Sequence, residues 1–134
     1  MSFDYGSKRT GIAISDPLKI ISSPYKTCKS SSVIDFIKHY INNEKIDVFV
    51  VGFPLNLKSK PTDATKIVKI FIQLLKKTFP LIPVKLIDER YTSKIASKAI
   101  LDAGKNKKYR REKTNIDKIS ASLILQSYLF NSKV

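Results

Sequence analysis

An acidic residue beside a short basic hairpin is the first place in this sequence where chemistry is expected. Asp4 precedes Gly6, Lys8 and Arg9, and Gly11 follows at the start of an apolar segment. The two glycines permit a tight turn and a close approach of the backbone that a side chain would block. A carboxylate next to phosphate-binding groups suits a metal-assisted reaction at phosphate. An exposed aspartate in an ordinary surface hairpin is the alternative interpretation.

Two later predicted strands end in further candidate residues. A continuous apolar run at residues 48–51 leads into a turn-rich loop that contains Asn56, and residues 84–87 lead into Asp88 and Glu89. Ligands of α/β proteins collect at the carboxyl ends of parallel strands. These side chains are therefore expected to converge with the carboxylate of the first hairpin.

Asp117 is the last acidic residue of the chain. With Thr114 as N-cap, it is predicted to lie in the first turn of the final helix, on the face that also carries Ala121. The helix dipole alone would explain an aspartate there. The same dipole would keep the carboxylate ionised, as a metal ligand requires.

The net charge of +14 indicates an anionic partner, most simply nucleic acid. The chain has 21 lysines and 4 arginines, so part of this charge reflects a general bias toward lysine. The arginines are more informative, because a guanidinium group binds phosphate bidentately. They are Arg9, Arg90, Arg110 and Arg111, and the last two lie in a basic run that also contains Lys108.

Hydrophobic periodicity predicts the element order β-β-β-α-β-α-β-α-α. Three antiparallel strands followed by β-α units give an α/β fold, with a mixed five-stranded sheet and helices on both faces. The predicted strands are a short one at residues 1–3 and others at 10–15, 20–29, 47–52 and 84–87. The predicted helices begin near residues 30–32, where three serines are N-cap candidates, and near residues 61, 92–93 and 114. Residues 1–134 are expected to form a single domain.

Composition argues against several other classes of protein. The apolar content of 43% is typical of a globular protein, and no apolar run is long enough to cross a bilayer. The single cysteine, Cys28, cannot form an internal disulfide, and His39 is the only histidine. These features favour a cytoplasmic protein with no membrane partner and without a cysteine- or histidine-rich metal site.

Four blocks of sequence together resemble the YqgF/RuvX family. In chain order they are Asp4-Tyr5-Gly6-x-Lys8-Arg9-x-Gly11, Val51-Gly52-Phe53-Pro54-Leu55-Asn56, Asp88-Glu89-Arg90-Tyr91-Thr92-Ser93, and Asp117-x-x-Ser120-Ala121 with Leu125, Tyr128 and Leu129. The resemblance implies an RNase H-like fold. It also implies a nuclease, described in the family both as a Holliday junction resolvase and as the enzyme that processes the 5′ end of precursor 16S rRNA.

The resemblance places the catalytic and metal-binding acids at Asp4, Glu89 and Asp117, with Asp88 as an adjacent rival for the middle role. Three such carboxylates would hold Mg²⁺ or Mn²⁺ for in-line hydrolysis of a phosphodiester. The residues expected to bind substrate are Gly6, Lys8, Arg9, Asn56, Arg90, Lys108, Arg110 and Arg111. This chain departs from the family at Tyr91, where leucine is usual, and in the loop after Asn56.

Precursor rRNA is the expected substrate, and branched DNA is the alternative. A resolvase needs a two-fold dimer, whereas this sequence shows no added dimer element, so a monomer or a weak homodimer is expected. Bases of a single strand are expected to stack on aromatic residues near the motifs: Tyr5, Phe53, Tyr91 and Tyr109. The alternative is that some of these residues belong to the core, Phe53 above all. Two rival functions remain. One is a phosphotransferase, because Asp4-x-Gly6-x-x-x-x-Gly11 in a hairpin also resembles the phosphate loop of the actin, hexokinase and Hsp70 ATPases. The other is a non-catalytic RNA-binding protein of ribosome assembly.

Overall fold

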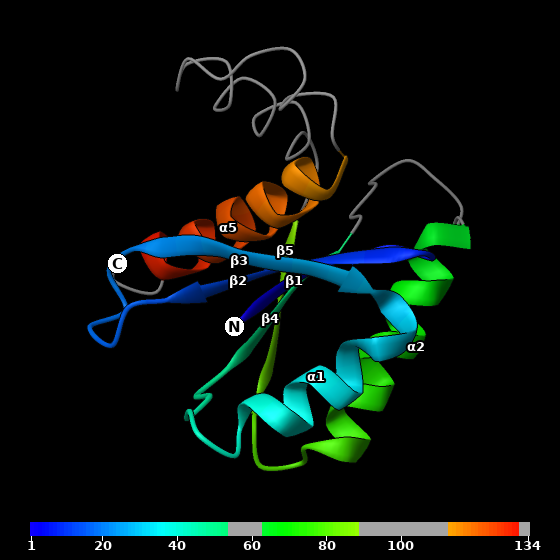
Figure 1. The fold of residues 1–134 in the computed structure, drawn as a ribbon, viewed down its shortest axis with the longest axis horizontal. Coiled ribbons are helices and arrows are strands. Elements are labelled where there is room, and N and C mark those ends of the chain that lie inside the picture. The colour runs from blue at the N-terminus through cyan, green and yellow to red at the C-terminus, as the bar shows by residue number, and fades with distance from the viewer. Residues whose placement is uncertain (54–62, 89–112, 132–134) are drawn as a thin grey trace.

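The computed structural model describes residues 1–53, 63–88 and 113–131 (Figure 1). The predicted helix that begins near residue 92 and the loop that contains Asn56 lie outside these ranges. The strands are β1 (Ser2–Tyr5), β2 (Arg9–Ser15), β3 (Ser22–Lys29), β4 (Phe49–Phe53) and β5 (Val84–Asp88). The helices are the short 3-10 turn η1 (Ser30–Ser32), α1 (Val33–Tyr40), α2 (Asp63–Thr78) and α5 (Lys113–Asn131). Among the described residues, no helix is long and apolar enough to cross a membrane.

The five strands form one mixed sheet in the order β3-β2-β1-β4-β5. Strands β1, β2 and β3 pair antiparallel, while β4 runs parallel to both β1 and β5. The sheet type and its antiparallel start, predicted from periodicity, are therefore confirmed. In this order β1 is central, and its carboxyl end lies beside the carboxyl end of β4.

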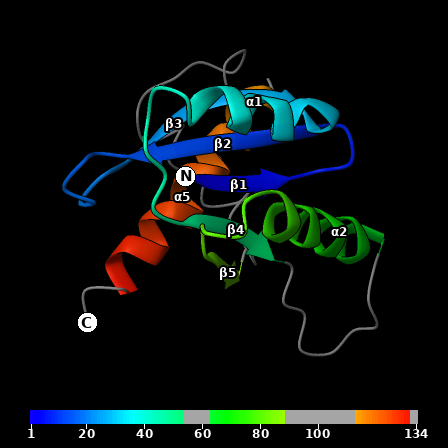
Figure 2. The same ribbon diagram turned by 90° about the horizontal axis from the view of Figure 1, so that it is seen from below.

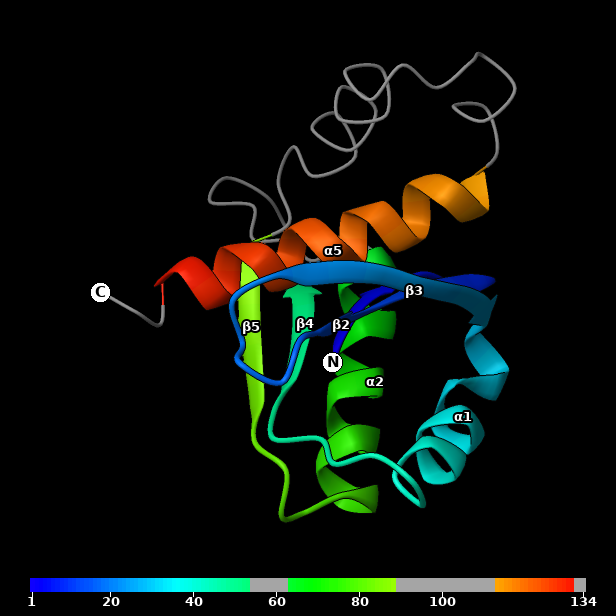
Figure 3. The same ribbon diagram turned by 60° about the vertical axis from the view of Figure 1, so that its left-hand side comes forward.

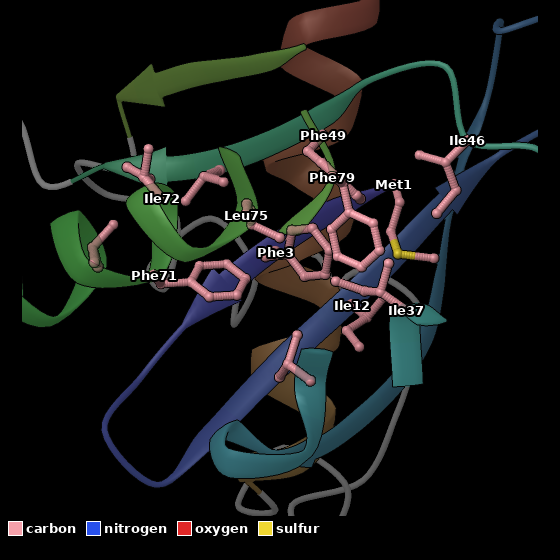
Figure 4. Packing of buried hydrophobic residues seen from close by; sticks show 13 residues of the cluster. Met1, Phe3, Ile12, Ile37, Ile46, Phe49, Phe71, Ile72, Leu75 and Phe79 are labelled. Carbon is pink, nitrogen blue, oxygen red and sulfur yellow. The ribbon is translucent and has the colours of Figure 1, made fainter. Parts of the chain in front are cut away.

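The larger core lies between the sheet and the two helices α1 and α2 (Figure 4). Phe3 of β1 packs against Phe49 of β4 and Phe71 of α2, with ring centroids 5.8 Å and 5.3 Å apart. Val33 and Ile37 place α1 in the same cluster. Figure 2 shows α1 above β2 and β3, and α2 beside β4. Burial of these apolar side chains sets the position of both helices.

Helix α5 covers the other face of the sheet (Figure 3). Its buried apolar residues are Ala121, Ile124, Leu125 and Leu129, which pack against Ala13 of β2 and Val50 of β4. The prediction of helices on both faces is confirmed. Hydrogen bonds add to this packing, because Ser22 of β3 bonds through its hydroxyl to the carbonyl oxygen of Ser122 at 2.7 Å.

The predicted start of the first helix is confirmed in position, because α1 begins at Val33 with Ser32 as its N-cap residue. Residues 30–32 form a 3-10 turn, however, and Ser32 makes no side-chain capping hydrogen bond. A second local prediction is wrong. Asp117 does not lie in the first turn of the last helix, because α5 already begins at Lys113. The helix dipole falls off within the first turn, so it does not explain the position of Asp117.

Candidate active site

Asp4 lies in the central strand on the face that α5 covers. Its neighbours Phe3 and Tyr5 point to the opposite face, where both contact Phe71 of α2. On the α5 face, the hydroxyl of Ser2 donates a hydrogen bond to the carbonyl oxygen of Ala121 at 2.6 Å. Because side chains alternate along a strand, Asp4 shares the face of Ser2.

Asp117 reaches the same place because α5 packs directly on the glycine opposite Asp4. Gly11 of β2 is the residue paired with Asp4. A Cβ atom at Gly11 would lie 2.0 Å from the carbonyl oxygen of Asp117. The helix backbone therefore touches the strand at this point, and only glycine leaves room for it.

The spacing of the contacts along α5 also matches their spacing along the strands. Ala121 contacts Ser2, and Asp117, one helical turn earlier, contacts the glycine paired with Asp4. Four helical residues advance about 6 Å. Two strand residues advance about 7 Å. The two contacts therefore match, and they bring the carboxylates at residues 4 and 117 to one region of the α5 face.

Arg9 forms an ion pair with Asp117 in this region. Its Nε lies 3.0 Å from a carboxylate oxygen of Asp117, and the two side chains are 39% and 23% exposed. A partly exposed pair of this kind contributes no more than about 1 kcal/mol to stability. Its main consequence is local, because it holds a guanidinium group beside a carboxylate in the candidate site.

Buried hydroxyl groups position the turn that carries Arg9. The amide of Gly6 donates to the carbonyl oxygen of Arg9 at 2.9 Å, and the amide of Ser30 donates to that of Lys8 at 3.0 Å. The Ser30 hydroxyl donates to the carbonyl oxygen of Gly6 at 2.5 Å and lies 2.8 Å from the hydroxyl of Thr10. Gly6 admits no side chain, since a Cβ there would lie 2.8 Å from the Arg9 carbonyl oxygen.

Sequence reasoning missed this supporting role of Ser30 and Thr10. It took residues 30–32 only as helix caps, and Thr10 only as a strand residue. The observed contact joins residues 20 positions apart. A run of three serines gives no signal for which hydroxyl would be buried against another strand.

Replacing Ser30 with Ala is expected to lower the free energy of unfolding by about 1–3 kcal/mol, because the buried hydroxyl of Thr10 and the partly buried carbonyl of Gly6 lose their partner. Denaturant titration measures this loss. The neighbouring Ser31 is exposed, so Ser31→Ala is the matched control and is expected to leave stability unchanged. Equal stability of the two variants would show that the hydroxyl network does not hold the turn.

Asp88 does not share the face of Asp4. It is paired with Phe53 at the carboxyl end of β4, and Phe53 packs against the core on the side of α1 and α2. Laterally paired residues of a sheet lie on the same face. Asp88 therefore points away from α5. The rival acid, Glu89, lies outside the described residues.

Of the predicted site residues, the structure brings together Asp4, Gly6, Lys8, Arg9 and Asp117. The others, Asn56, Glu89, Arg90, Lys108, Arg110 and Arg111, lie outside the described ranges. Within those ranges, no group of three or more acidic, histidine or cysteine side chains could hold a metal ion. The described part of the site thus supplies two carboxylates of the expected three.

The aromatic residues near the motifs belong largely to the core. Tyr5 stacks on Phe71 with ring centroids 4.1 Å apart, and burial raises the pKa of its hydroxyl. Phe53 packs against the same core. Tyr5 and Phe53 thus contribute to the core, which is the alternative stated for these aromatic residues and for Phe53 above all. Tyr91 and Tyr109 lie outside the described residues.

A cavity of about 730 Å³ lies at the opposite end of the sheet and includes none of the predicted site residues. Two of its acidic residues, Asp47 and Asp16, have structural partners. Asp47 pairs with Lys19 at 3.0 Å, which holds the pKa of Asp47 below its usual value. Asp16 accepts hydrogen bonds from the amides of Ile21 and Ile20, and these lower the pKa of Asp16.

Known proteins resemble this chain along almost its whole length. A protein of Amoebophilus asiaticus named "Putative pre-16S rRNA nuclease" is 43% identical over 133 residues, which cover 99% of this chain and 94% of that protein. A protein of Parabacteroides distasonis with the same name is 44% identical, with coverage of 99% and 95%.

A solved structure shares the fold at lower identity. The crystal structure of the fowlpox virus resolvase with its substrate Holliday junction DNA matches with a TM-score of 0.57 and 17% identity, and it covers 98% of this chain and 96% of that chain. This likeness supports the RNase H-like fold. The family model RuvX, described as Holliday junction resolvase, matches residues 1–131. With this match and two relatives above 40% identity, the chain belongs to the RuvX family.

Proposed function

We propose that this protein is a metal-dependent nuclease that hydrolyses phosphodiester bonds in precursor 16S rRNA. The observation that carries the proposal is the contact of α5 with Gly11, which brings Asp117 to the face of the sheet that carries Asp4. A basic hairpin with Lys8 and Arg9 borders the two carboxylates. Paired carboxylates next to phosphate-binding cations suit hydrolysis of a phosphodiester.

The donor chemistry fits Mg²⁺ or Mn²⁺. Both ions prefer oxygen ligands, and the carboxylates of Asp4 and Asp117 supply them. Glu89 is the third proposed ligand, and the placement of Asp88 on the other face supports that choice over its neighbour. When bound, such an ion would polarise the phosphate and lower the pKa of water.

The protein's own groups would bind and orient the substrate. Arg9 would contact the phosphate next to the scissile bond, since its guanidinium group already lies beside Asp117. Lys8, exposed at the tip of the hairpin, would bind a neighbouring phosphate. The hydrogen bonds from Ser30 would keep this turn in one conformation, so that both cations are placed before the substrate arrives.

Precursor 16S rRNA is proposed as the substrate because relatives above 40% identity carry that name. The second candidate is a Holliday junction, which is favoured by the description of the family model. The fowlpox resolvase is only 17% identical to this chain, so its junction substrate is weaker support than the names of the relatives above 40% identity. A protein that acts alone, or as a weak dimer, would suit RNA better than paired incision of a junction.

The test is cleavage of a precursor 16S rRNA 5′ end and of a four-way DNA junction by the purified protein, with Mg²⁺, Mn²⁺ or EDTA. The proposal expects a defined cut in the RNA that requires the metal. Paired symmetric cuts in the junction with the RNA intact would support the resolvase instead. Binding of RNA without cleavage under any metal condition would support a non-catalytic assembly protein.

Replacing Arg9 with Gln is expected to weaken substrate affinity by roughly 10- to 100-fold, as expected for a lost hydrogen bond to a charged group. The free energy of unfolding should change by less than about 1 kcal/mol, because the pair with Asp117 is partly exposed. Arg9→Lys keeps the charge without bidentate binding, so it should restore part of the affinity. Affinity equal to the unmodified protein in both variants would contradict the role of Arg9.

A further inference from the structure

A second group of cations continues from the candidate active site onto the edge strand β3. Lys29 is paired directly with Arg9, so the two side chains lie on the same α5 face. Like charges placed opposite one another on neighbouring strands destabilise a sheet. The charge of Arg9 is compensated by its ion pair with Asp117, whereas Lys29 is exposed. An anionic ligand next to Arg9 would offset this repulsion.

The rest of β3 is also suited to an anion. Among the described strands it lies at the edge and pairs only with β2, and its sequence from Ser22 to Lys29 contains no acidic residue. Lys26 and Lys29 are both exposed. Lys26 is paired with Ile12, so it lies on the α1 side of the sheet, whereas Lys29 lies on the α5 side. Positively charged side chains of β3 therefore lie on both faces of the sheet at this edge.

An exposed aromatic ring lies next to Lys26. Tyr25 is 45% exposed, and its ring is supported by Phe36 and Tyr40 of α1, with centroid distances of 5.9 Å and 6.0 Å. The Lys26 ammonium lies 4.9 Å from the centroid of the Phe36 ring. A supported aromatic ring beside a cation is the combination that binds single-stranded nucleic acid, through base stacking and phosphate contact.

We infer that the edge of β3 is a binding track for the single-stranded RNA that flanks the cleavage site. Lys29 and Lys26 would contact successive phosphates, and Tyr25 would stack a base. The four residue steps from Lys29 to Tyr25 span roughly 13 Å. The inference rests on the proposed nuclease function, and it extends the substrate contact beyond the residues that carry the reaction.

A protein strand fits this edge less well than RNA. Pro24 lies within β3 and has no amide to donate. The pairing of β3 also shifts register between Ile12 and Ala13, where one extra residue is accommodated. Both features protect a sheet edge from adding another strand. The exposed side chains, rather than the backbone, are thus the groups offered to a partner.

The test uses full-length protein with Asp4→Asn, so that RNA remains intact, and a fluorescent single-stranded RNA from the precursor 5′ end. The double variant Lys26→Ala, Lys29→Ala is expected to lower the slope of log affinity against log salt by about 1.4, or about 0.7 for each lost phosphate contact. The matched control is Lys76→Ala, Lys77→Ala on α2, which removes the same charge from exposed positions of another element. The control should leave the slope nearly unchanged.

Replacing Tyr25 tests base stacking, a contact that does not depend on charge. Tyr25→Ala is expected to weaken RNA affinity roughly 5- to 150-fold, and Tyr25→Phe, which keeps the ring, should restore it. Equal slope changes in the two lysine double variants would overturn the track, because any exposed charge would then suffice. No change in the β3 variant would overturn it as well.

Failure of the track and failure of the proposed function give different results. The first case uses protein that retains Asp4 and carries Lys26→Ala and Lys29→Ala. Normal cleavage with an unchanged KM for long RNA would refute the track alone. A protein that binds RNA through β3 with the expected slope change but never cleaves would refute the nuclease and leave the track in place.

Discussion

Replacing Asp4 with Asn is expected to lower the rate of metal-dependent cleavage by at least about 100-fold, since loss of groups that only support a metal ligand already costs 10- to 100-fold. Asparagine has nearly the same shape as aspartate but carries no charge, so it would hold a divalent ion poorly. The side chain lies in the central strand on the face that also receives Asp117. Cleavage kinetics and Mn²⁺ titration of the purified variant measure the effect.

Asp88→Asn is the matched control for this experiment. It makes the same chemical change on the opposite face of the sheet, where Asp88 is paired with Phe53. This variant is expected to retain cleavage, while Asp117→Asn is expected to lose it like Asp4→Asn. Normal turnover of Asp4→Asn would reject the assignment. A large drop in its melting temperature would show instead that the carboxylate has a structural role.

Replacing Gly11 with Ala is expected both to destabilise the protein and to abolish cleavage. The added Cβ would lie 2.0 Å from the carbonyl oxygen of Asp117, so α5 must move away from β2. Overpacking of this kind costs about 1–3 kcal/mol, and more where backbone must shift. Displacement of α5 would also separate Asp117 from Asp4, so that metal affinity falls together with stability. Urea unfolding and Mn²⁺ binding by the folded fraction measure the two effects.

Gly6→Ala provides the comparison. Its Cβ would lie 2.8 Å from the carbonyl oxygen of Arg9, and it would disturb the turn without touching α5. It should therefore weaken substrate affinity while leaving metal affinity close to normal. If Gly11→Ala kept normal stability and cleavage, the close contact between α5 and the sheet would not be what assembles the site.

Local patterns in the sequence predict most of the elements and most of the candidate residues. Alternating apolar residues predicted β2, and the apolar run before Gly52 predicted β4, because a strand covered on both faces needs apolar side chains throughout. Asp4, Lys8, Arg9 and Asp117 could be proposed from motifs, since their types and local spacing are properties of the chain alone. The mixed sheet followed from the order of those elements.

Which of these residues meet depends on tertiary packing and cannot be predicted from local patterns. The Arg9–Asp117 pair joins residues 108 positions apart, and the Thr10–Ser30 contact depends on how β2 packs against η1. Strand periodicity gives two faces but does not say which face a distant helix will cover. That choice depends on side-chain volume and close packing across the sheet, where the missing side chain of Gly11 admits the α5 backbone. For the same reason, the face on which Asp88 lies follows from the pairing of β5 with β4 and not from the local sequence.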